Sequence, residues 1–344
     1  MKLVAVGDTF LPYCYSDFPP LGNVTDIIRD SDIGICNLEG PISQRGMPLE
    51  KCCLSMPPEA AKYFVTSGFN LFNLANNHIF DYGIQAFEET CILLSKLGGC
   101  WFGAGRNLQD AIRPAVKEIN GVRIGFLGYG WDFIGCIYAD QSRFGVSPLN
   151  RQLVIECVRG ILEQVDVVVV SLHWGYERER YPLPHHRQLA HDIIDAGASV
   201  VLGHHPHVLQ GIEEYHRGII AYSLGNFIFP NYSYKKYHLI QREENRTSVI
   251  LKCTFFTKNM WEWDIIPVYQ KDDFVPVVLT GAEGHRVISE VRQLSNPFSL
   301  GIKDYRRFWS KHRIRKDLPE VRGTNLCDRL RLRSYRILHG FSGG

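Results

Sequence analysis

Short runs of apolar residues recur along the first 230 positions and alternate with stretches whose apolar residues have helical spacing. The runs are rich in Val, Ile and Leu, as buried strands are, and the intervening stretches are long enough for amphipathic helices. Strands that alternate with helices predict an α/β layer architecture. We expect strands at 3–7, 33–37, 70–75, 122–128, 165–172 and 198–203, and helices at 82–97, 151–164 and 185–196.

The same pattern predicts antiparallel pairing in two places. Asn120 and Gly121 separate two apolar runs in "EINGVRIGF", and this dipeptide favours a tight hairpin. We therefore expect a sheet that is not purely parallel. Nearer the C-terminus, three further runs predict a β-meander that extends the same domain; they lie at 248–256, 260–269 and 273–281.

Beyond about residue 290 the chain becomes basic and aromatic, and two segments, 302–316 and 326–338, predict helices. Residues 301–344 contain twelve Lys and Arg against four Asp and Glu, a net charge of +8 within a chain total of +2, so the preceding residues carry −6. Such a basic tail favours contact with an anionic surface or a protein, or with the acidic body itself. Basic aromatic segments also occur in single-strand binders, but a nucleic-acid partner is not expected, because basic amphipathic helices more often lie on other surfaces.

The composition indicates a large globular protein, with 344 residues of which 45% are hydrophobic and 22% charged. No run approaches the roughly 20 apolar residues that span a bilayer, and the first residues lack the pattern of an export signal. The ten cysteines are scattered and form no CxxC pair, which favours free thiols in a reducing compartment. We therefore expect a cytoplasmic protein.

Residues with metal-binding or proton-transfer chemistry follow five of the predicted strands. In open α/β sheets ligands bind beyond the carboxyl ends of the strands, so we expect these side chains at one rim. Their oxygen and nitrogen donors, without thiolate, match the ligands of hard to borderline divalent metals. The residues are Asp8, Glu39, Asn76, Asn77, His78, His173, His204, His205 and His207.

Each of these residues alone also has a purely structural explanation. Asp8 could cap a turn, Glu39 could be a loop charge, and Asn77 and His78 could begin a helix. His173 could be a hydrogen-bonded histidine of the core. Three imidazoles within four residues of "GHHPH" are costly without a ligand, and the shared position at strand ends favours a functional site over these alternatives.

Seven motifs in order carry a family resemblance: "GDTFL", "NLEGPI", "NLANNHIFDYG", "FGAGRN", "HWGYE", "DAGASVVLGHHPHVLQG" and "YSLGNFIF". Together they resemble the CapA-type capsule or poly-γ-glutamate synthesis proteins of the calcineurin-like metallophosphoesterase superfamily. The resemblance covers about residues 1–285. It implies a four-layer α/β/β/α sandwich with mixed sheets over 1–285. The remainder, 286–344, is predicted from its own composition to be a basic, aromatic, helical extension.

The resemblance also implies roles for individual residues. His78 would contact the phosphate or the leaving group, and Asp81 would orient His78 by accepting its other ring N–H. Three further residues, His204, Asn226 and Glu177, would surround the ligands or contact the substrate. The metal ligands would be Asp8, Glu39, Asn77, His173, His205 and His207.

Two positions depart from the superfamily pattern. Phe10 stands where a histidine is usual, two residues after the first aspartate, and Glu39 stands in place of an aspartate. The site is therefore expected to hold one or two divalent ions, and Mn, Fe, Zn and Mg all suit its donors.

The function implied is metal-dependent hydrolysis of a phosphorylated small molecule or an anionic polymer, in capsule, polysaccharide or poly-γ-glutamate metabolism. The alternative is a non-catalytic accessory protein of capsule synthesis that binds an anionic polymer or a partner enzyme. Phe10 favours the accessory role, whereas His78 favours the hydrolase, because a binding module has no use for a leaving-group acid.

Overall fold

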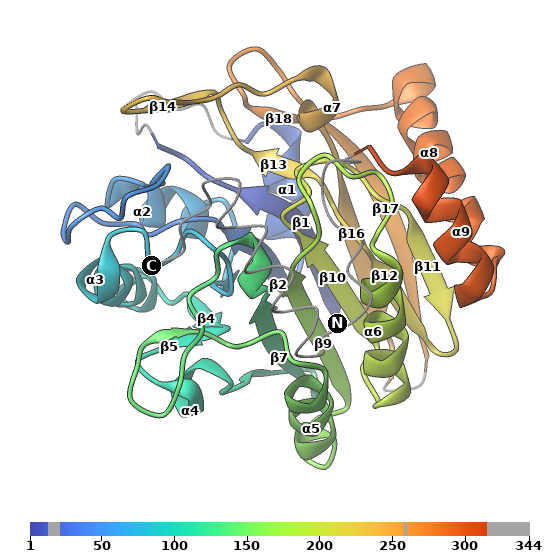
Figure 1. The fold of residues 1–344 in the computed structure, drawn as a ribbon, viewed down its shortest axis with the longest axis horizontal. Helices are drawn as coiled ribbons and strands as arrows, with labels where there is room; N and C mark the ends of the chain where they lie inside the picture. The colour runs from blue at the N-terminus through green and yellow to red at the C-terminus, as the bar shows by residue number, and fades with distance from the viewer. Residues whose placement is uncertain (13–20, 258–259, 315–344) are drawn as a thin grey trace.

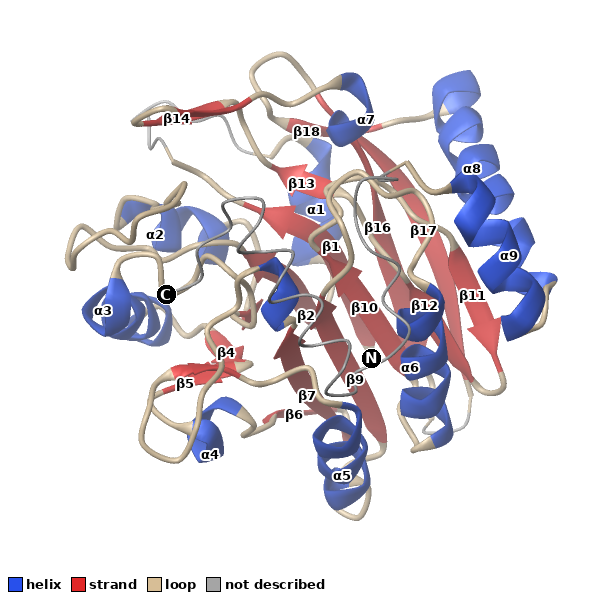
Figure 2. Cartoon of the chain, in the orientation of Figure 1, coloured by secondary structure: helices blue, strands red, loops and turns tan. Residues whose placement is uncertain are grey.

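The computed structural model describes residues 1–12, 21–257 and 260–314. Two large β-sheets stack face to face, and helices cover the outer face of each (Figures 1 and 2). The layer order is α/β/β/α with mixed sheets, which confirms the predicted fold class.

The first sheet has the strand order β18-β17-β16-β1-β2-β3-β4, and β13 adds to the end of β1. Strands β1 to β4 and β13 run parallel, whereas β16, β17 and β18 pair antiparallel and form the predicted meander. The bounds are β1 (Lys2–Thr9), β2 (Ile33–Leu38), β3 (Leu71–Asn73), β4 (Cys100–Phe102), β13 (Asn226–Ile228), β16 (Thr247–Phe255), β17 (Trp261–Gln270) and β18 (Pro276–Val278).

The second sheet has the order β11-β12-β10-β9-β7-β6. Its β6–β7 pair is the predicted hairpin: Asn120 and Gly121 have φ of 52° and 77°, as a two-residue turn with left-handed central residues requires. The bounds are β6 (Ala115–Ile119), β7 (Val122–Gly130), β9 (Val167–His173), β10 (Val200–His204), β11 (Ile212–Tyr215) and β12 (Gly218–Ala221). Two small antiparallel sheets join β5 (Ala104–Gly105) to β8 (Gly145–Val146) and β14 (Tyr232–Tyr234) to β15 (Tyr237–Leu239), and the second of them is a hairpin.

Helices on the outer faces complete the four layers. The predicted helices at 82–97, 151–164 and 185–196 are observed as α3 (Gly83–Lys96), α5 (Arg151–Ile161) and α6 (Pro184–Asp195). Several short helical elements lie in the loops. The remaining helical bounds are α1 (Asn23–Arg29), α2 (Glu59–Thr66), α4 (Leu108–Ala111), η1 (Asp132–Ile134), α7 (Glu243–Arg246), α8 (Gly281–Ser295), η2 (Asn296–Ser299) and α9 (Ile302–His312).

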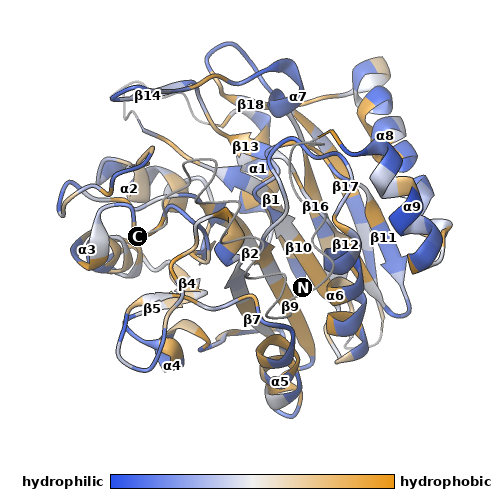
Figure 3. Ribbon diagram, in the orientation of Figure 1, coloured by the Kyte–Doolittle hydropathy of each residue, from blue (hydrophilic) through white to orange (hydrophobic). Residues whose placement is uncertain are grey.

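Three apolar clusters fill the spaces between the four layers. Along β1, Leu3 and Ala5 face the second sheet, whereas Val4 and Val6 face the helices of the first. Val168 and Val170 of β9 likewise face α5, α6 and α9. Strands buried on both faces read as continuous apolar runs, and β9 and β10 are coloured as hydrophobic over much of their length in Figure 3.

Helices α8 and α9 pack against the body of the protein. Val287, Val291 and Leu294 of α8 join the apolar cluster between the sheets, and Tyr305 and Trp309 of α9 join the cluster outside the second sheet. The expected boundary between residues 285 and 286 thus lies within α8. The helix expected at 302–316 is observed as α9, whereas the one expected at 326–338 lies outside the described residues.

Two further expectations concern the compartment. Among the described residues, eight cysteines carry free thiols: Cys36, Cys52, Cys53, Cys91, Cys100, Cys136, Cys157 and Cys253. Within the same part of the chain, none of the helices has the length and apolar character needed to cross a membrane.

Candidate metal centre

The carboxyl ends of the parallel strands deliver the candidate side chains to one place. Asp8 lies near the end of β1, paired with Asn37 of β2 and Asn226 of β13. His173 and His204 end β9 and β10 and are paired with each other. The carboxyl ends of the strands in both sheets therefore carry candidate metal ligands. This position agrees with the prediction that these residues follow the strands.

Glu39 lies at the centre of the site. It belongs to two groups of potential ligands, Asp8–Glu39–His173 and Glu39–His205–His207, and within each group the ligand atoms lie within 4.8 Å of one another. Its Oε1 is 3.7 Å from Nε2 of His173 and 3.6 Å from Nε2 of His207. Neither carboxylate oxygen has a hydrogen-bond partner, although the side chain is fully buried.

An unpartnered buried carboxylate is costly unless a cation compensates for the lost solvent. The two groups also supply only imidazole and carboxylate donors, the set that suits divalent Mn, Fe, Zn or Mg. The residues present therefore fit one or two divalent ions, and Glu39 is the residue that both groups share.

Burial sets the protonation of these groups. It raises the pKa of Glu39 well above its ordinary value, and the nearby charge of Asp8 adds to the effect. Burial lowers the pKa of His173 and of His205 well below the ordinary value, and neighbouring imidazoles lower the pKa of both further. The histidines are therefore neutral at physiological pH, which is the form that binds metals.

Asn37, which the sequence did not mark as functional, connects the ligands. Its Nδ2 donates to Oδ1 of Asp8 at 2.8 Å and lies 3.2 Å from Nδ1 of His173. Its own Oδ1 accepts a hydrogen bond from Nδ2 of Asn73 at 2.8 Å. The only feature of the sequence that marks Asn37 and Asn73 is that each is a polar residue at the end of an apolar strand.

The loop between β3 and α3 brings Asn77, His78 and Asp81 to the site. Oδ1 of Asn77 lies 2.9 Å from Nε2 of His173. Nδ1 of His78 lies 2.6 Å from Oδ2 of Asp81, the contact that an orienting role of Asp81 requires. Burial lowers the pKa of His78, and the charge of Asp81 opposes the shift.

Lys51 supports this loop and was also missed by sequence reasoning. Its Nζ lies 2.5 Å from Oδ1 of Asp81 and donates to the carbonyl of Asn77 at 2.6 Å. The backbone N–H of Leu54 donates to the other carboxylate oxygen of Asp81 at 2.7 Å. Lys51 and the N–H of Leu54 thus hold the two carboxylate oxygens of Asp81, in addition to its contact with His78.

The histidine loop has an unusual backbone. His205 and His207 have φ of 91° and 58°, a left-handed region that costs energy for residues other than glycine and is often found at functional sites. Nδ1 of His207 lies 2.9 Å from Oδ1 of Asn226. This contact places Asn226 beside His207 and leaves Nε2 of His207 toward Glu39.

Two of the predicted surrounding residues occupy different positions. His204 is buried, with Nδ1 3.8 Å from Oδ1 of Asp8 and without a hydrogen-bond partner, and it belongs to neither three-residue group. Glu177 is exposed to solvent, and its negative charge contributes to the raised pKa of Glu39. His204 thus lies behind Asp8, whereas Glu177 lies on the solvent side.

Phe10 contributes no donor to the site. It is fully buried and packs against Phe229 and Tyr232, with ring centroids 5.3 Å and 5.1 Å away. The ring of His207 also contacts Phe229, at 5.0 Å. At the place where the superfamily usually has a histidine, this chain has an aromatic cluster that packs beside the ligands.

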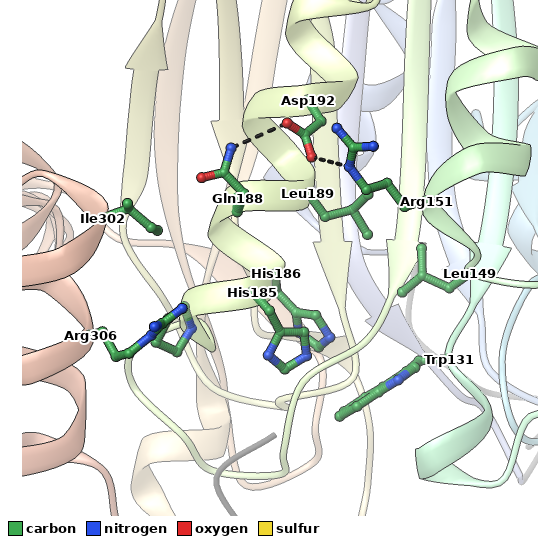
Figure 4. Close-up of a pocket in the computed structure, with 11 residues that line it drawn as sticks. Trp131, Leu149, Arg151, His185, His186, Gln188, Leu189, Asp192, Ile302 and Arg306 are labelled. Atoms are coloured by element: carbon green, nitrogen blue, oxygen red, sulfur yellow. Dashed lines mark hydrogen bonds and ion pairs between the residues drawn. The ribbon is translucent and has the colours of Figure 1, made fainter. Parts of the chain in front are cut away.

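A pocket of about 300 Å³ lies apart from these residues, between α6, α9 and the start of α5 (Figure 4). Trp131 and Arg306 approach it from opposite sides, and none of the predicted site residues lines it. His186, in its wall, stacks on Trp174 at 4.7 Å. Trp174 in turn donates its backbone N–H to the carbonyl of His204 at 3.1 Å, so it contacts the end of β10 directly before His205.

The family described as "Bacterial capsule synthesis protein PGA_cap" matches residues 2–231. "Capsule biosynthesis protein CapA" of Bacillus anthracis is 30% identical over 305 residues, which cover 84% of this chain and 68% of that protein. "PGA biosynthesis protein CapA" of Bacillus subtilis is 36% identical over 211 residues, which cover 60% and 55%. A "Probable polyglutamine synthesis accessory protein" of Mycobacterium tuberculosis is 27% identical over 231 residues, covering 61% and 59%. The chain thus spans between about half and two-thirds of these relatives.

Among solved structures, the "Putative 5'-Nucleotidase" from Staphylococcus aureus has a TM-score of 0.51 at 12% identity, covering 85% of this chain and 58% of that one. At this identity the likeness shows the fold alone.

Proposed function

The chain belongs to the bacterial capsule synthesis family PGA_cap, and from this premise we propose that it is a metal-dependent phosphoester hydrolase. The observation that carries the proposal is the buried, unpartnered carboxylate of Glu39, shared by two groups of potential ligands. Its substrate would be a phosphorylated small molecule or an anionic polymer used in capsule or poly-γ-glutamate metabolism.

Each proposed ion would have its own group of ligands. Asp8, Glu39 and His173 would hold one divalent ion, and Glu39, His205 and His207 would hold a second. Asn77, whose Oδ1 lies against His173, would add an amide oxygen to the set. When bound, such ions supply the positive charge that stabilises phosphoryl transfer and activates water at neutral pH.

His78 would serve the leaving group. Because Asp81 accepts the hydrogen bond from Nδ1, Nε2 is the ring atom that can hold or release a proton toward the departing oxygen. Lys51 and the N–H of Leu54 keep Asp81 in place, so the imidazole is oriented before substrate arrives. Burial lowers the pKa of His78, and the negative charge of a bound phosphoester acts in the opposite direction.

A second candidate function is an accessory role without catalysis. Two observations favour it: the aromatic cluster of Phe10 occupies a usual ligand position, and one relative is named a synthesis accessory protein. The chain would then bind an anionic polymer or a partner enzyme.

The test is hydrolysis of 4-nitrophenyl phosphate and bis(4-nitrophenyl) phosphate by chelator-treated protein resupplied with Mn, Fe, Zn or Mg. We expect turnover only after metal is added, and loss of turnover in His205→Ala and His207→Ala. Arg306→Gln, in the separate pocket, is the matched control and keeps the wild-type rate. Metal binding without turnover on any phosphoester would favour the accessory role, and turnover retained by the histidine variants would contradict the proposal.

A further inference from the structure

We propose that the β14–β15 hairpin recognises a second anionic group of the substrate, a carboxylate or a phosphate, beside the phosphoester bound at the metal centre. The inference rests on the proposed function and extends it to a substrate class: compounds with at least two anionic groups. The hairpin follows β13 closely, so it comes directly after the strand that carries Asn226 to the metal centre.

One side of the hairpin base is tied to a proposed metal ligand. Oδ1 of Asn226 lies 2.9 Å from Nδ1 of His207, and Nδ2 of Asn226 donates to Oε1 of Gln241 at 3.0 Å. The backbone N–H of Gln241 donates to Oδ1 of Asn231 at 2.7 Å. Asn231 and Gln241 flank the hairpin in the chain, so this series of hydrogen bonds fixes both ends of the hairpin beside His207.

The other side of the hairpin is tied to the loop of the proposed leaving-group acid. Tyr82 lies near Tyr232 and Tyr234 of the hairpin, and burial, together with these two neighbours, raises its pKa. Tyr82 directly follows Asp81, the partner of His78. The hairpin therefore spans from the histidine ligands to the His78 loop, along one side of the site.

The tip of the hairpin presents two unneutralised positive charges. Lys235 and Lys236 are exposed, and among the described residues neither forms an ion pair. Their ammonium groups lie over the rings of Tyr234 and Tyr237, 5.1 Å and 5.5 Å from the centroids. Figure 3 shows β14 as hydrophilic, projecting at the upper left of the molecule.

Two adjacent lysines on an element anchored at the site provide point charges for a carboxylate or a phosphate. Exposed ion pairs contribute modestly, so the lysines would select among substrates instead of supplying the main binding energy. A single phosphoester group held at the metal centre would not need them. A substrate with a second anionic group near the first would use both sites.

The test compares three substrates with one aromatic skeleton: phenyl phosphate, 4-carboxyphenyl phosphate and 1,4-phenylene bisphosphate. The quantity measured is kcat/KM for each substrate relative to phenyl phosphate, with metal-loaded protein. In Lys235→Gln/Lys236→Gln we expect this ratio to fall about threefold to tenfold, the effect of losing two exposed ion pairs. The control is Lys303→Gln/Lys311→Gln, which removes the same charge from exposed positions on α9, on the opposite side of the molecule in Figure 1.

The outcomes separate this inference from the proposed function. If the ratio of the hairpin variant falls for the carboxylate substrate, the bisphosphate or both, the result supports anion recognition by the hairpin and identifies the anion. Ratios equal to those of wild type overturn the inference and leave the proposed hydrolase function standing. If no substrate is hydrolysed, the proposed function fails, and calorimetric titration with 1,4-phenylene bisphosphate then decides. Weaker binding by the hairpin variant still supports recognition, while equal affinity, or no binding to wild type, overturns it.

Discussion

The backbone N–H of His205 donates a hydrogen bond to Oδ2 of Asp8, with 3.0 Å between the two atoms. The residues are 197 positions apart and belong to different sheets: Asp8 lies in β1, and His205 follows β10. This contact holds the histidine loop against the first strand. It thereby brings together the two groups of potential metal ligands that share Glu39. The proposed chemistry depends on this proximity.

The role of His78 predicts a dependence on the leaving group. His78→Gln should lower kcat for a phosphomonoester with an alkyl leaving group by about 100-fold or more, the usual contribution of a general acid. The loss with 4-nitrophenyl phosphate should be much smaller, because nitrophenolate departs without a proton. Steady-state kinetics with both substrates measures the difference, and equal losses would assign His78 to binding instead.

Asp81 should affect the same step indirectly. Asp81→Asn keeps the shape of the side chain but weakens its hold on Nδ1 of His78 and its ion pair with Lys51. We expect kcat for the alkyl substrate to fall about 10- to 100-fold, as when a partner of a catalytic histidine is removed. The measurement is the pH profile of kcat, in which a change of shape as well as height distinguishes positioning of His78 from loss of folded protein.

Glu39→Gln should have opposite effects on stability with and without metal. The pKa of Glu39 in the folded protein is raised above 4.5. Protonation of Glu39 therefore contributes fully to stability below pH 4.5, and this contribution is lost as the pH rises through the folded-state pKa. In chelator, wild type should lose stability relative to the variant by about 1.4 kcal/mol per pH unit in this window. With Mn²⁺ the order reverses, since the variant lacks the shared ligand.

Urea unfolding at pH 5 and pH 8, in chelator and in Mn²⁺, measures these differences. Glu262→Gln, an exposed carboxylate on β17, is the control and should change stability by less than about 0.5 kcal/mol. A variant that is no more stable than wild type at pH 8 in chelator would show that Glu39 is compensated by neighbours other than a cation.

Arg187 should hold the segment after α8 to the body of the protein. Its guanidinium donates to both carboxylate oxygens of Glu213, at 2.7 Å and 3.2 Å, and to the carbonyl of Leu300 at 2.8 Å. Arg187→Met leaves Glu213 without its cationic partner, with only the Tyr222 hydroxyl and the His191 ring beside it, and should cost about 3–5 kcal/mol. Chemical denaturation measures the loss, and Arg151→Met, which breaks an exposed pair with Asp192, should cost at most about 1 kcal/mol.

The sequence predicted the parts of the site that depend on parallel strand ends. Asp8, His173 and His204 lie where strand periodicity and sheet topology placed them, and the hairpin at Asn120 followed from local turn chemistry. Asn37 could not be recognised, because a polar residue at the end of an apolar run looks like any strand terminus until the neighbouring strand is known.

Other features depend on tertiary packing. Lys51 lies in a loop without local pattern, and only the fold brings it to Asp81. The packing of α8 against the apolar cluster between the two sheets was also hidden, because its contacts with β11 and β17 depend on the tertiary fold and on no local pattern. The expected boundary at 285/286 therefore lies within a helix that belongs to the core.

The most direct measurement is the metal content of the purified protein together with its rate of 4-nitrophenyl phosphate hydrolysis, on the same sample, before and after chelation and resupply of Mn²⁺ or Zn²⁺. We predict at least one bound equivalent in wild type, turnover that disappears with chelation and returns with metal, and loss of both in His205→Ala. Protein that binds no metal after resupply, or that hydrolyses the ester equally well without it, would contradict the assignment of Glu39 and the histidines to a hydrolytic metal centre.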